Sequence, residues 1–365
     1  MHGTQLASGI GTVLVILVLG LLGALEPLDT WWFDRLFELR GRRAPTTPIV
    51  IVTIDESSIT EINRQWPFPR AVHADLIDRI SAGHPLAIGV DLLFDGPSAW
   101  GARDDEALGA AIMRAGTVVL SAAKTTHVQM LDGQVAVERT FSRVPLPVIR
   151  RGAAAVAHTK IPVETDAHIR RARLERLLFG DQALPAFDTV IHEIAGRAGL
   201  RVRPLPTAPE ILINFRGGPR TFPWVPYYRV LRGEVRSEVF SGKIVLIGAT
   251  SPLLHDLFPT VFAGSGDMPG IEIHANVIET LVRGDPVRAT PRWVSTIVAV
   301  GLSLLGWAVV VRRRASGLVA IGVLWVLLTF GVIASFVMLD LWIQWMAGTL
   351  GLALGSISAG MASSS

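Results

Sequence analysis

Four acidic or imidazole side chains in the middle of the sequence could together form a polar site. Asp55 and Asp91 each follow an apolar run typical of a buried strand, and His73 and His274 lie early in stretches typical of helices. Carboxylate oxygens and imidazole nitrogens can hold a divalent ion, so a membrane-anchored metal-dependent hydrolase is one hypothesis. Their spacing is not diagnostic, because the same residue types also cap helices and make hydrogen bonds in ordinary cores.

The sequence lacks the signatures of common catalytic sites. It has no G-x-x-x-x-G-K-[ST] phosphate loop, no G-x-S-x-G elbow, no H-E-x-x-H pair and no kinase or cyclase signature. It has no cysteine, which excludes thiolate nucleophiles, disulfides and cysteine-based zinc sites. Its arginines are scattered, so nucleic-acid binding is not expected. We predict that the chain is not an enzyme and uses no metal or cofactor, with the hydrolase as the less favoured alternative.

Alternating strands and helices are expected to position the polar residues. The pattern predicts apolar strands at residues 49–54, 86–92, 117–121, 211–215 and 243–247, and helices at 70–82, 104–115, 187–198 and 270–283. Such alternation is typical of an α/β domain with a mostly parallel sheet covered on both faces. Between residues 128 and 150 the pattern becomes turn-rich, and Asp132 with Gly133 is typical of a hairpin turn.

Polar side chains lie at the predicted carboxyl ends of several of these strands. Parallel sheets bind ligands beyond the carboxyl ends of their strands, and the two histidines begin helices that could approach the same edge. The candidates for ligand binding are therefore Asp55, His73, Asp91, Asn214 and His274.

Apolar residues are concentrated at both ends of the chain. The 365 residues are 50% hydrophobic and only 18% charged, with a mean hydropathy of +0.44, which is too apolar for an ordinary soluble protein. Runs long enough to span a bilayer lie at residues 6–27, 293–311, 318–339 and 341–360. We predict four transmembrane α-helices, one N-terminal and three C-terminal, around a domain at residues 49–288. The first run could instead be a cleaved signal peptide, but no basic segment precedes it.

Charged residues beside the spans indicate the orientation in the membrane. Arg312, Arg313 and Arg314 lie between the second and third predicted spans and favour a cytoplasmic loop. This places the middle domain outside and both chain ends inside. Arg35, Arg40, Arg42 and Arg43 follow the first span and favour the opposite orientation, but the triplet is the denser signal.

Two further patterns predict packing near the bilayer. Residues 29–48 are expected to form a juxtamembrane helix and a linker, with Trp32, Leu36 and Leu39 on the apolar side of the helix. In the last span a stripe of small residues recurs every four positions, at Ala347, Gly351, Gly355 and Ala359. Such a stripe allows close approach either to another span of the same chain or to a second copy, so it offers a contact for self-association.

Six stretches of the middle region occur in a recognisable order. They are IVIVTIDE at 49–56, WPFPR at 66–70, VDLLF at 90–94, INFRG at 213–217, FSGKIVLIGAT at 240–250 and MPGIEIHAN at 268–276. Together they resemble the type-2 CHASE domain, an extracytoplasmic sensory domain of bacterial receptors. The segment DAHIRR at 166–171 departs from the family's usual Asp-x-Asp-Gly-x-x-Arg-Arg, which puts the local turn in doubt.

The resemblance implies a multi-pass sensor of the bacterial inner membrane, with its sensor domain periplasmic or extracellular. It implies an extracytoplasmic ligand that it does not identify, and a cytoplasmic nucleotide cyclase or kinase as effector. The sequence ends soon after the last predicted span, so we expect that effector to be missing from this chain or to be a separate partner. The alternative is a structural membrane protein that uses its outer domain to assemble with copies of itself.

Overall fold

The computed structural model describes residues 2–131 and 134–364. The chain divides into two compact units. The helical unit comprises Met1–Gly41 and Val287–Ser365, and the sheet unit comprises Arg42–Pro286.

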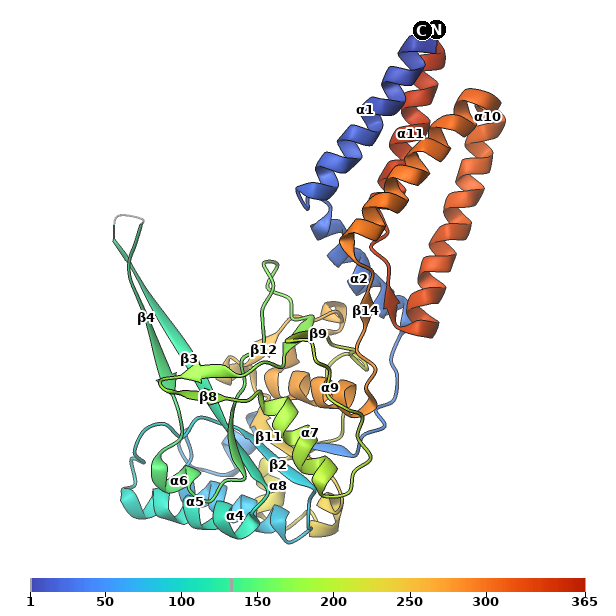
Figure 1. The fold of residues 1–365 in the computed structure, drawn as a ribbon. Coiled ribbons are helices and arrows are strands. Elements are labelled where there is room, and N and C mark those ends of the chain that lie inside the picture. Colours follow the sequence, from blue (N-terminus) through green and yellow to red (C-terminus); the bar gives the residue numbers. More distant parts are fainter. Residues whose placement is uncertain (1, 132–133, 365) are drawn as a thin grey trace. The chain divides into compact units, whose positions relative to one another are not determined.

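The helical unit consists mainly of apolar helices. Its elements are α1 (His2–Leu21), α2 (Glu26–Arg40), β14 (Arg288–Ala289), α10 (Arg292–Leu339), β15 (Leu341–Trp342) and α11 (Met346–Ser364). The ribbon of α10 turns back on itself (Figure 1). Near that turn, a Cβ atom at Gly317 would lie 2.9 Å from the carbonyl oxygen of Val309, so the two limbs approach too closely for a larger residue.

The four predicted spans are only partly borne out. Among the described residues, two stretches are long and apolar enough to cross a membrane, Arg292–Arg313 and Ser316–Leu339. The first and last predicted spans correspond to shorter apolar stretches, Ala7–Gly20 and Met346–Met361.

The connections around the last helices also differ from the prediction. The arginine triplet was expected in a loop, but this segment is helical; Arg312 and Arg313 are exposed, and the side chain of Arg314 lies outside the described part of the chain. The last helix begins at Met346 rather than at residue 341. Asp340 ends α10 in the left-handed conformation, and the residues that follow it pair with β14.

Helix α2 packs within the helical unit through an aromatic face. Its buried residues include Phe33 and Phe37, which contact the rings of Phe336 and Trp342. Leu36 is also buried, whereas Leu39 is 59% exposed, and the position of this helix at the bilayer surface stays a prediction. The aromatic partners on α10 and β15 select the buried face, and the sequence of α2 by itself does not reveal them.

The stripe of small residues in α11 packs against α10 of the same chain. A Cβ atom at Gly351 would lie 2.4 Å from the carbonyl oxygen of Ala299, and one at Gly355 would lie 2.1 Å from that of Ser303. Ala347 is half-buried and Ala359 is buried. Of the two roles considered for this stripe, close packing within the chain is the one found. Self-association stays a prediction, but the stripe no longer supplies a contact for it.

The sheet unit contains a central sheet in the order β10-β1-β11-β2-β3-β4, with β5 also paired to β3. Its strands are β1 (Ile49–Ile54), β2 (Ala87–Asp91), β3 (Val118–Leu131), β4 (Gln134–Arg143), β5 (Ala155–His158), β10 (Trp224–Pro226) and β11 (Ile244–Ala249). All of these pairings are parallel except that of β3 with β4. Three small antiparallel pairs are β6 (Arg171–Arg173) with β9 (Glu210–Leu212), β7 (Leu177–Phe179) with β8 (Gln182–Leu184), and β12 (Leu257–Phe258) with β13 (Met268–Pro269).

Helices cover both faces of the central sheet (Figure 1). They are α3 (Glu56–Glu61), α4 (Arg70–Ser81), α5 (Ala102–Ala115), α6 (Pro147–Arg150), α7 (Phe187–Arg197), α8 (Tyr227–Leu231) and α9 (Gly270–Arg283), with short 3-10 turns η1 (Ser237–Phe240), η2 (Pro252–Leu254) and η3 (Ala263–Ser265). The predicted mostly parallel α/β sheet with two covered faces is confirmed. Its continuously apolar strands are explained by burial on both sides.

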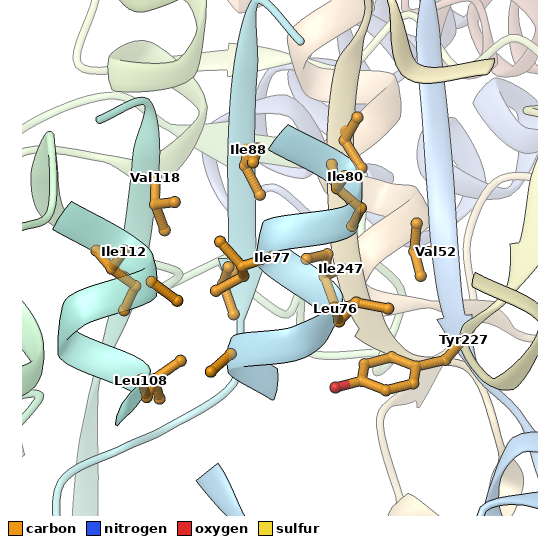
Figure 2. Packing of buried hydrophobic residues seen from close by; sticks show 14 of the residues in the cluster. Val52, Leu76, Ile77, Ile80, Ile88, Leu108, Ile112, Val118, Tyr227 and Ile247 are labelled. Atoms are coloured by element: carbon orange, nitrogen blue, oxygen red, sulfur yellow. The ribbon is translucent and has the colours of Figure 1, made fainter. Parts of the chain in front are cut away.

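Alternate residues of β1 enter two separate cores. Val50 and Val52 face the core built with α4, α5 and α8, whereas Ile49 and Ile51 face the core built with α7 and α9. Figure 2 shows Ile77 of α4 and Ile112 of α5 packed against the first face of the sheet. This two-sided packing fixes the register of the sheet, because a slip by one residue would exchange the two faces.

Two sequence predictions fail in the middle of the unit. β3 continues well beyond residue 121 and pairs with β4 as a long antiparallel hairpin, where turn-rich pieces were expected. The turn predicted at Asp132 and Gly133 lies outside the described residues. The strand predicted at residues 211–215 is β9, which pairs with β6 rather than joining the central sheet. Strand propensity is local, but the choice of pairing partner is not.

Candidate functional site

Two of the five predicted ligand-binding residues, Asp91 and His274, lie together at the carboxyl end of the central sheet. Asp91 is the last residue of β2 and lies opposite Gly248 of β11. His274 belongs to the second turn of α9. Their charges interact, and each shifts the pKa of the other. The polar edge expected from the strand pattern is therefore present in this part of the sheet.

Asp188, in the first turn of α7, makes a buried hydrogen bond with His274. The His274 Nδ1 group donates to Asp188 Oδ1 at 2.8 Å, and the two residues are 2% and 3% exposed. Burial by itself would lower the pKa of His274. The charge of Asp188, this hydrogen bond and the charges of Asp91 and Asp256 outweigh burial and raise that pKa to about 9. The imidazole is therefore protonated at neutral pH.

Asp256 adds a third carboxyl group at the start of α9. A Cβ atom at Gly270 would lie 2.7 Å from Asp256 Oδ2, so the carboxyl group lies close against the first residue of this helix. Burial, followed by the charge of Asp91, raises the pKa of Asp256 to about 7. Burial also raises the pKa of Asp91, whose carboxyl group is hydrogen-bonded to Thr159.

We call Asp91, Asp188, Asp256 and His274 the acid–imidazole cluster. If all four groups were ionised, negative charge would exceed positive charge in a largely buried place, which is unfavourable. The raised pKa values of Asp91 and Asp256 relieve this excess by retaining protons. The arrangement can take up and release protons near neutral pH and can attract a cationic group. Within the described ranges, no group of three or more such side chains is arranged to hold a metal ion.

Asp55 has a structural role at the start of α3. Its Oδ1 atom accepts hydrogen bonds from the backbone N–H of Ser58 at 2.7 Å and from the Ser57 hydroxyl at 2.8 Å. Both interactions satisfy groups at a helix N-terminus. The carboxyl group thus caps helix α3, which is the structural role expected as the alternative to ligand binding. Asp55 is not a member of the acid–imidazole cluster.

His73 lies in an aromatic core rather than at a polar edge. It is 3% exposed and packs against Phe68, Phe94 and Tyr227. Burial, together with the charge of Arg70, lowers the pKa of His73 to about 3, so the ring is neutral at ordinary pH. The Tyr227 hydroxyl and the His73 Nδ1 atom share a hydrogen bond of 2.7 Å. This is a hydrogen-bonded core histidine.

Asn214 belongs to a second polar network, near the two ends of the sheet unit. Its Nδ2 atom donates to the carbonyl oxygen of Asp285 at 2.8 Å. Arg216, two residues later, donates to both carboxylate oxygens of Asp285 at 2.8 Å and lies 3.4 Å from Glu279 Oε1. We call Asn214, Arg216, Glu279 and Asp285 the junction network.

Glu279 connects this network to the segment that leads into β1. Its carboxylate accepts the backbone N–H groups of Thr46 at 3.0 Å and Thr47 at 2.8 Å. Burial would raise the pKa of Glu279, but the hydrogen bonds from these threonines and the charge of Arg216 outweigh burial and lower it. The first and last segments of the sheet unit are thus held together by a carboxylate whose charged form is stabilised.

Helix α9 carries further buried polar contacts from the MPGIEIHAN stretch. Glu272 accepts backbone N–H groups from Arg220, Thr221 and Phe222. Asn276 Oδ1 accepts the backbone N–H of Arg216 at 2.9 Å. Sequence reasoning singled out neither glutamate of this helix. The available signal was two acidic residues seven positions apart, hence on one face of the helix.

The segment at 166–171 forms an ordered turn despite its unusual sequence. Ala167 occupies the position of the family's glycine and adopts φ +66°, a left-handed conformation that favours glycine. Arg170 is 2% exposed and is bound by Glu164 at 2.8 Å and by Asp166 at 2.7 Å. The hydrogen bond from Arg170 helps to lower the pKa of Asp166 to about 2. The doubt raised by the sequence is resolved in favour of the turn.

Comparison with known proteins gives one match. The model of the CHASE2 domain family matches residues 11–311, from within α1 through the sheet unit and into the first limb of α10. No curated protein and no solved structure matches the chain. The match covers most of the chain and agrees with the six stretches found in the sequence. The chain therefore belongs to the CHASE2 domain family, an extracytoplasmic sensory domain family of signal transduction.

Proposed function

We propose that this chain is a membrane-bound sensor of bacterial signal transduction. The sheet unit receives an extracytoplasmic stimulus, and the helices convey it to a cytoplasmic nucleotide cyclase or kinase. The observation that carries this proposal is the extent of the family match. Residues 11–311 include apolar helix on both sides of the sheet unit, so the sensory domain and flanking membrane segments form one matched region.

The proposed topology has four spans in the bacterial inner membrane, with the sheet unit outside and both chain ends inside. The two limbs of α10 meet the length and hydropathy expected of spans. α1 has 20 residues and α11 has 19, which gives each helix a length of about 30 Å at 1.5 Å per residue, near the thickness of the hydrocarbon core. Arg312 and Arg313 are exposed at the turn between the limbs, which supports a cytoplasmic turn.

Within the sheet unit, the acid–imidazole cluster is the proposed place where the stimulus acts. It lies at the carboxyl end of parallel strands, where ligands of α/β sheets bind. Its carboxyl groups at Asp91 and Asp256 have raised pKa values, which is typical of functional sites. Of the residues proposed from the sequence, Asp91 and His274 remain candidates for contact with a ligand. Asp55, His73 and Asn214 are accounted for by structural contacts.

Reporter fusions test the topology on which the proposal depends. We expect a reporter fused after Ala44 to be active outside the cytoplasm and one fused after Arg314 to be active inside it. A third fusion, after Pro286, serves as the matched control and should behave like the fusion after Ala44, because both sites belong to the ends of the sheet unit. The same compartment for Ala44 and Arg314 would contradict the four-span arrangement.

A further inference from the structure

A basic hollow lies on the sheet unit beside the junction network. It has a volume of about 340 Å³ and is lined by residues 46–48, 200–203 and 282–283. These segments lead into β1, follow α7 and end α9, respectively. The volume is at the lower end of the range for small-molecule sites, roughly 300 to 1,000 Å³, and suits a compact ligand rather than a large one.

The charge of the lining is entirely positive. It contains Arg201, Arg203 and Arg283 and no acidic residue. Arg283 has partners, because its guanidinium group donates to the Thr46 hydroxyl at 2.9 Å and to Asp285 at 2.7 Å. Within residues 2–131 and 134–364, no carboxylate lies within ion-pair distance of Arg201 or Arg203. Two guanidinium groups at the hollow are therefore available to a ligand.

The backbone holds these two arginines in place. Leu200 and Val202 pack against the core that α7 and α9 share, whereas Arg201 and Arg203 alternate with them and are exposed. The backbone N–H of Arg203 donates to the carbonyl oxygen of Val282 at 3.1 Å, which ties this segment to the end of α9. The exposed side chains thus extend from a segment that is anchored on its other side.

Basic residues at the end of a helix have an ordinary role, which is to offset the partial negative charge of its last carbonyl groups. Arg283 fulfils this role in the last turn of α9. Arg201 and Arg203 belong to neither α7 nor α9. The contact of Arg203 with the end of α9 is made by its backbone N–H, which donates to the carbonyl oxygen of Val282, and not by its side chain. Helix capping therefore does not account for their two unpaired guanidinium groups.

We propose that this hollow binds a phosphate group, held by the guanidinium groups of Arg201 and Arg203. Guanidinium groups match phosphate oxygens in geometry and form charge-assisted pairs with them. The bound group would contact residues 46–48 and 282–283 at once. It would thus bridge the first and last segments of the sheet unit beside the junction network. The phosphate group could belong to a soluble phosphate or to an anionic phospholipid, and both present the same oxygens.

The first arm of the test uses inorganic phosphate and the full chain in a neutral detergent. Thermal unfolding is followed while phosphate replaces chloride at constant pH and ionic strength. A ligand that binds the folded state raises the unfolding temperature in a saturable way. We expect Arg201→Gln with Arg203→Gln to weaken the apparent affinity by about tenfold or more, since both charge-assisted contacts are lost.

The second arm places the chain in phosphate-free buffer in bilayers of phosphatidylcholine, with or without phosphatidylglycerol. The matched control for both arms is Arg150→Gln with Arg151→Gln, which removes equal charge from the same unit at residues outside the hollow. A saturable rise in the unfolding temperature in the first arm assigns the site to soluble phosphate. A rise in the second arm alone assigns it to lipid. No saturable response in either arm, or equal losses in the Arg201/Arg203 and Arg150/Arg151 variants, would overturn the proposal.

Discussion

Two buried polar groups on helix α9 differ in how they hold their charge. Near the start of the helix, His274 lies in a cluster with three carboxyl groups, two of which have raised pKa values. Farther along, Glu279 lies between Arg216 and two backbone N–H groups, and its pKa is lowered. Both glutamate and histidine are almost fully buried. Burial alone therefore does not decide whether a group titrates.

The difference lies in the donors available to the carboxyl groups. Glu279 receives hydrogen bonds from Thr46 and Thr47, which stabilise the charged form. Asp91 and Asp256 instead lie near other carboxyl groups, with one imidazole shared among them. The junction network is thus a fixed structural connection, whereas the acid–imidazole cluster responds to pH. That contrast suits a sensor whose stimulus site must change while its connection to the rest of the chain stays intact.

The largest expected effect comes from removing the carboxylate of the junction network. Glu279→Ala would leave the backbone N–H groups of Thr46 and Thr47 without this acceptor and Arg216 with one fewer partner. We expect a loss of about 3 kcal/mol in the free energy of unfolding, because a buried charged network is broken on one side. The loss should be the same at pH 5 and pH 8, measured by thermal unfolding of the full chain in detergent.

The matched control is Glu193→Ala on α7. Glu193 forms an exposed ion pair with Arg197, and exposed pairs contribute little to stability. We expect a much smaller change in the unfolding temperature. If the two variants lost similar stability, the junction network would not be the firm connection described here.

An intermediate, pH-dependent effect is expected from Asp256→Asn. The folded-state pKa of about 7 lies above the ordinary aspartate pKa of 3.8, so the folded chain holds this proton more tightly than the unfolded chain. Stability is then lost as pH rises from about 4 towards 7. Between pH 5 and pH 8 the variant should gain roughly 2 to 3 kcal/mol of stability relative to the wild type, because it cannot ionise.

His274 changes stability in the same direction at higher pH. Its contribution is present below the ordinary histidine pKa of 6.5 and is lost as pH rises through its folded-state pKa of about 9. The control for the aspartate is Asp166→Asn, since the pKa of Asp166 is lowered to about 2 and its contribution is lost only under strongly acidic conditions. The cost of Asp166→Asn should therefore be equal at pH 5 and pH 8. If the effect of Asp256→Asn did not depend on pH, the acid–imidazole cluster would no longer differ from the junction network in its response to pH.

The smallest effect is expected from Ala167→Gly. This residue lies beside a buried arginine that is ion-paired, as Arg216 is in the junction network. Ala167 adopts φ +66° next to the pair of Arg170 and Asp166. Glycine removes the steric cost of this conformation, so we expect a gain of about 0.5 to 1 kcal/mol in the free energy of unfolding. Ala198→Gly, at φ −81°, is the control and should lose stability. A loss at both positions would mean that the turn is not strained.

Much of the α/β architecture could be predicted because its signals are local. The run at 49–54 is continuously apolar and forms a central strand, and the amphipathic pattern at 270–283 forms α9. Asp55 and Ser58 show that capping also follows from neighbouring residues. The family resemblance rested on stretches of the same kind and was confirmed over residues 11–311.

The partners of polar groups could not be predicted in this way. Asp188 and His274 are 86 residues apart, and no periodic pattern connects them. The same limit explains Asn214, which was expected at the end of a strand of the central sheet. The strand before it, β9, ends at Leu212 and pairs with β6 outside that sheet. An isolated strand carries no signal of which neighbour it will join.

The sequence by itself determined the apolar strands, the amphipathic helices and the apolar segments at both ends, because hydrophobic periodicity acts over a few residues. The strand pattern also placed Asp91 and His274 at one edge of the sheet, but the tertiary structure alone decided that Asp188 and Asp256 join them there. It also decided that Glu279 binds Thr46 and Thr47 at the other. The physical reason is that these contacts form only after distant segments have packed, and the burial that shifts each pKa exists only then.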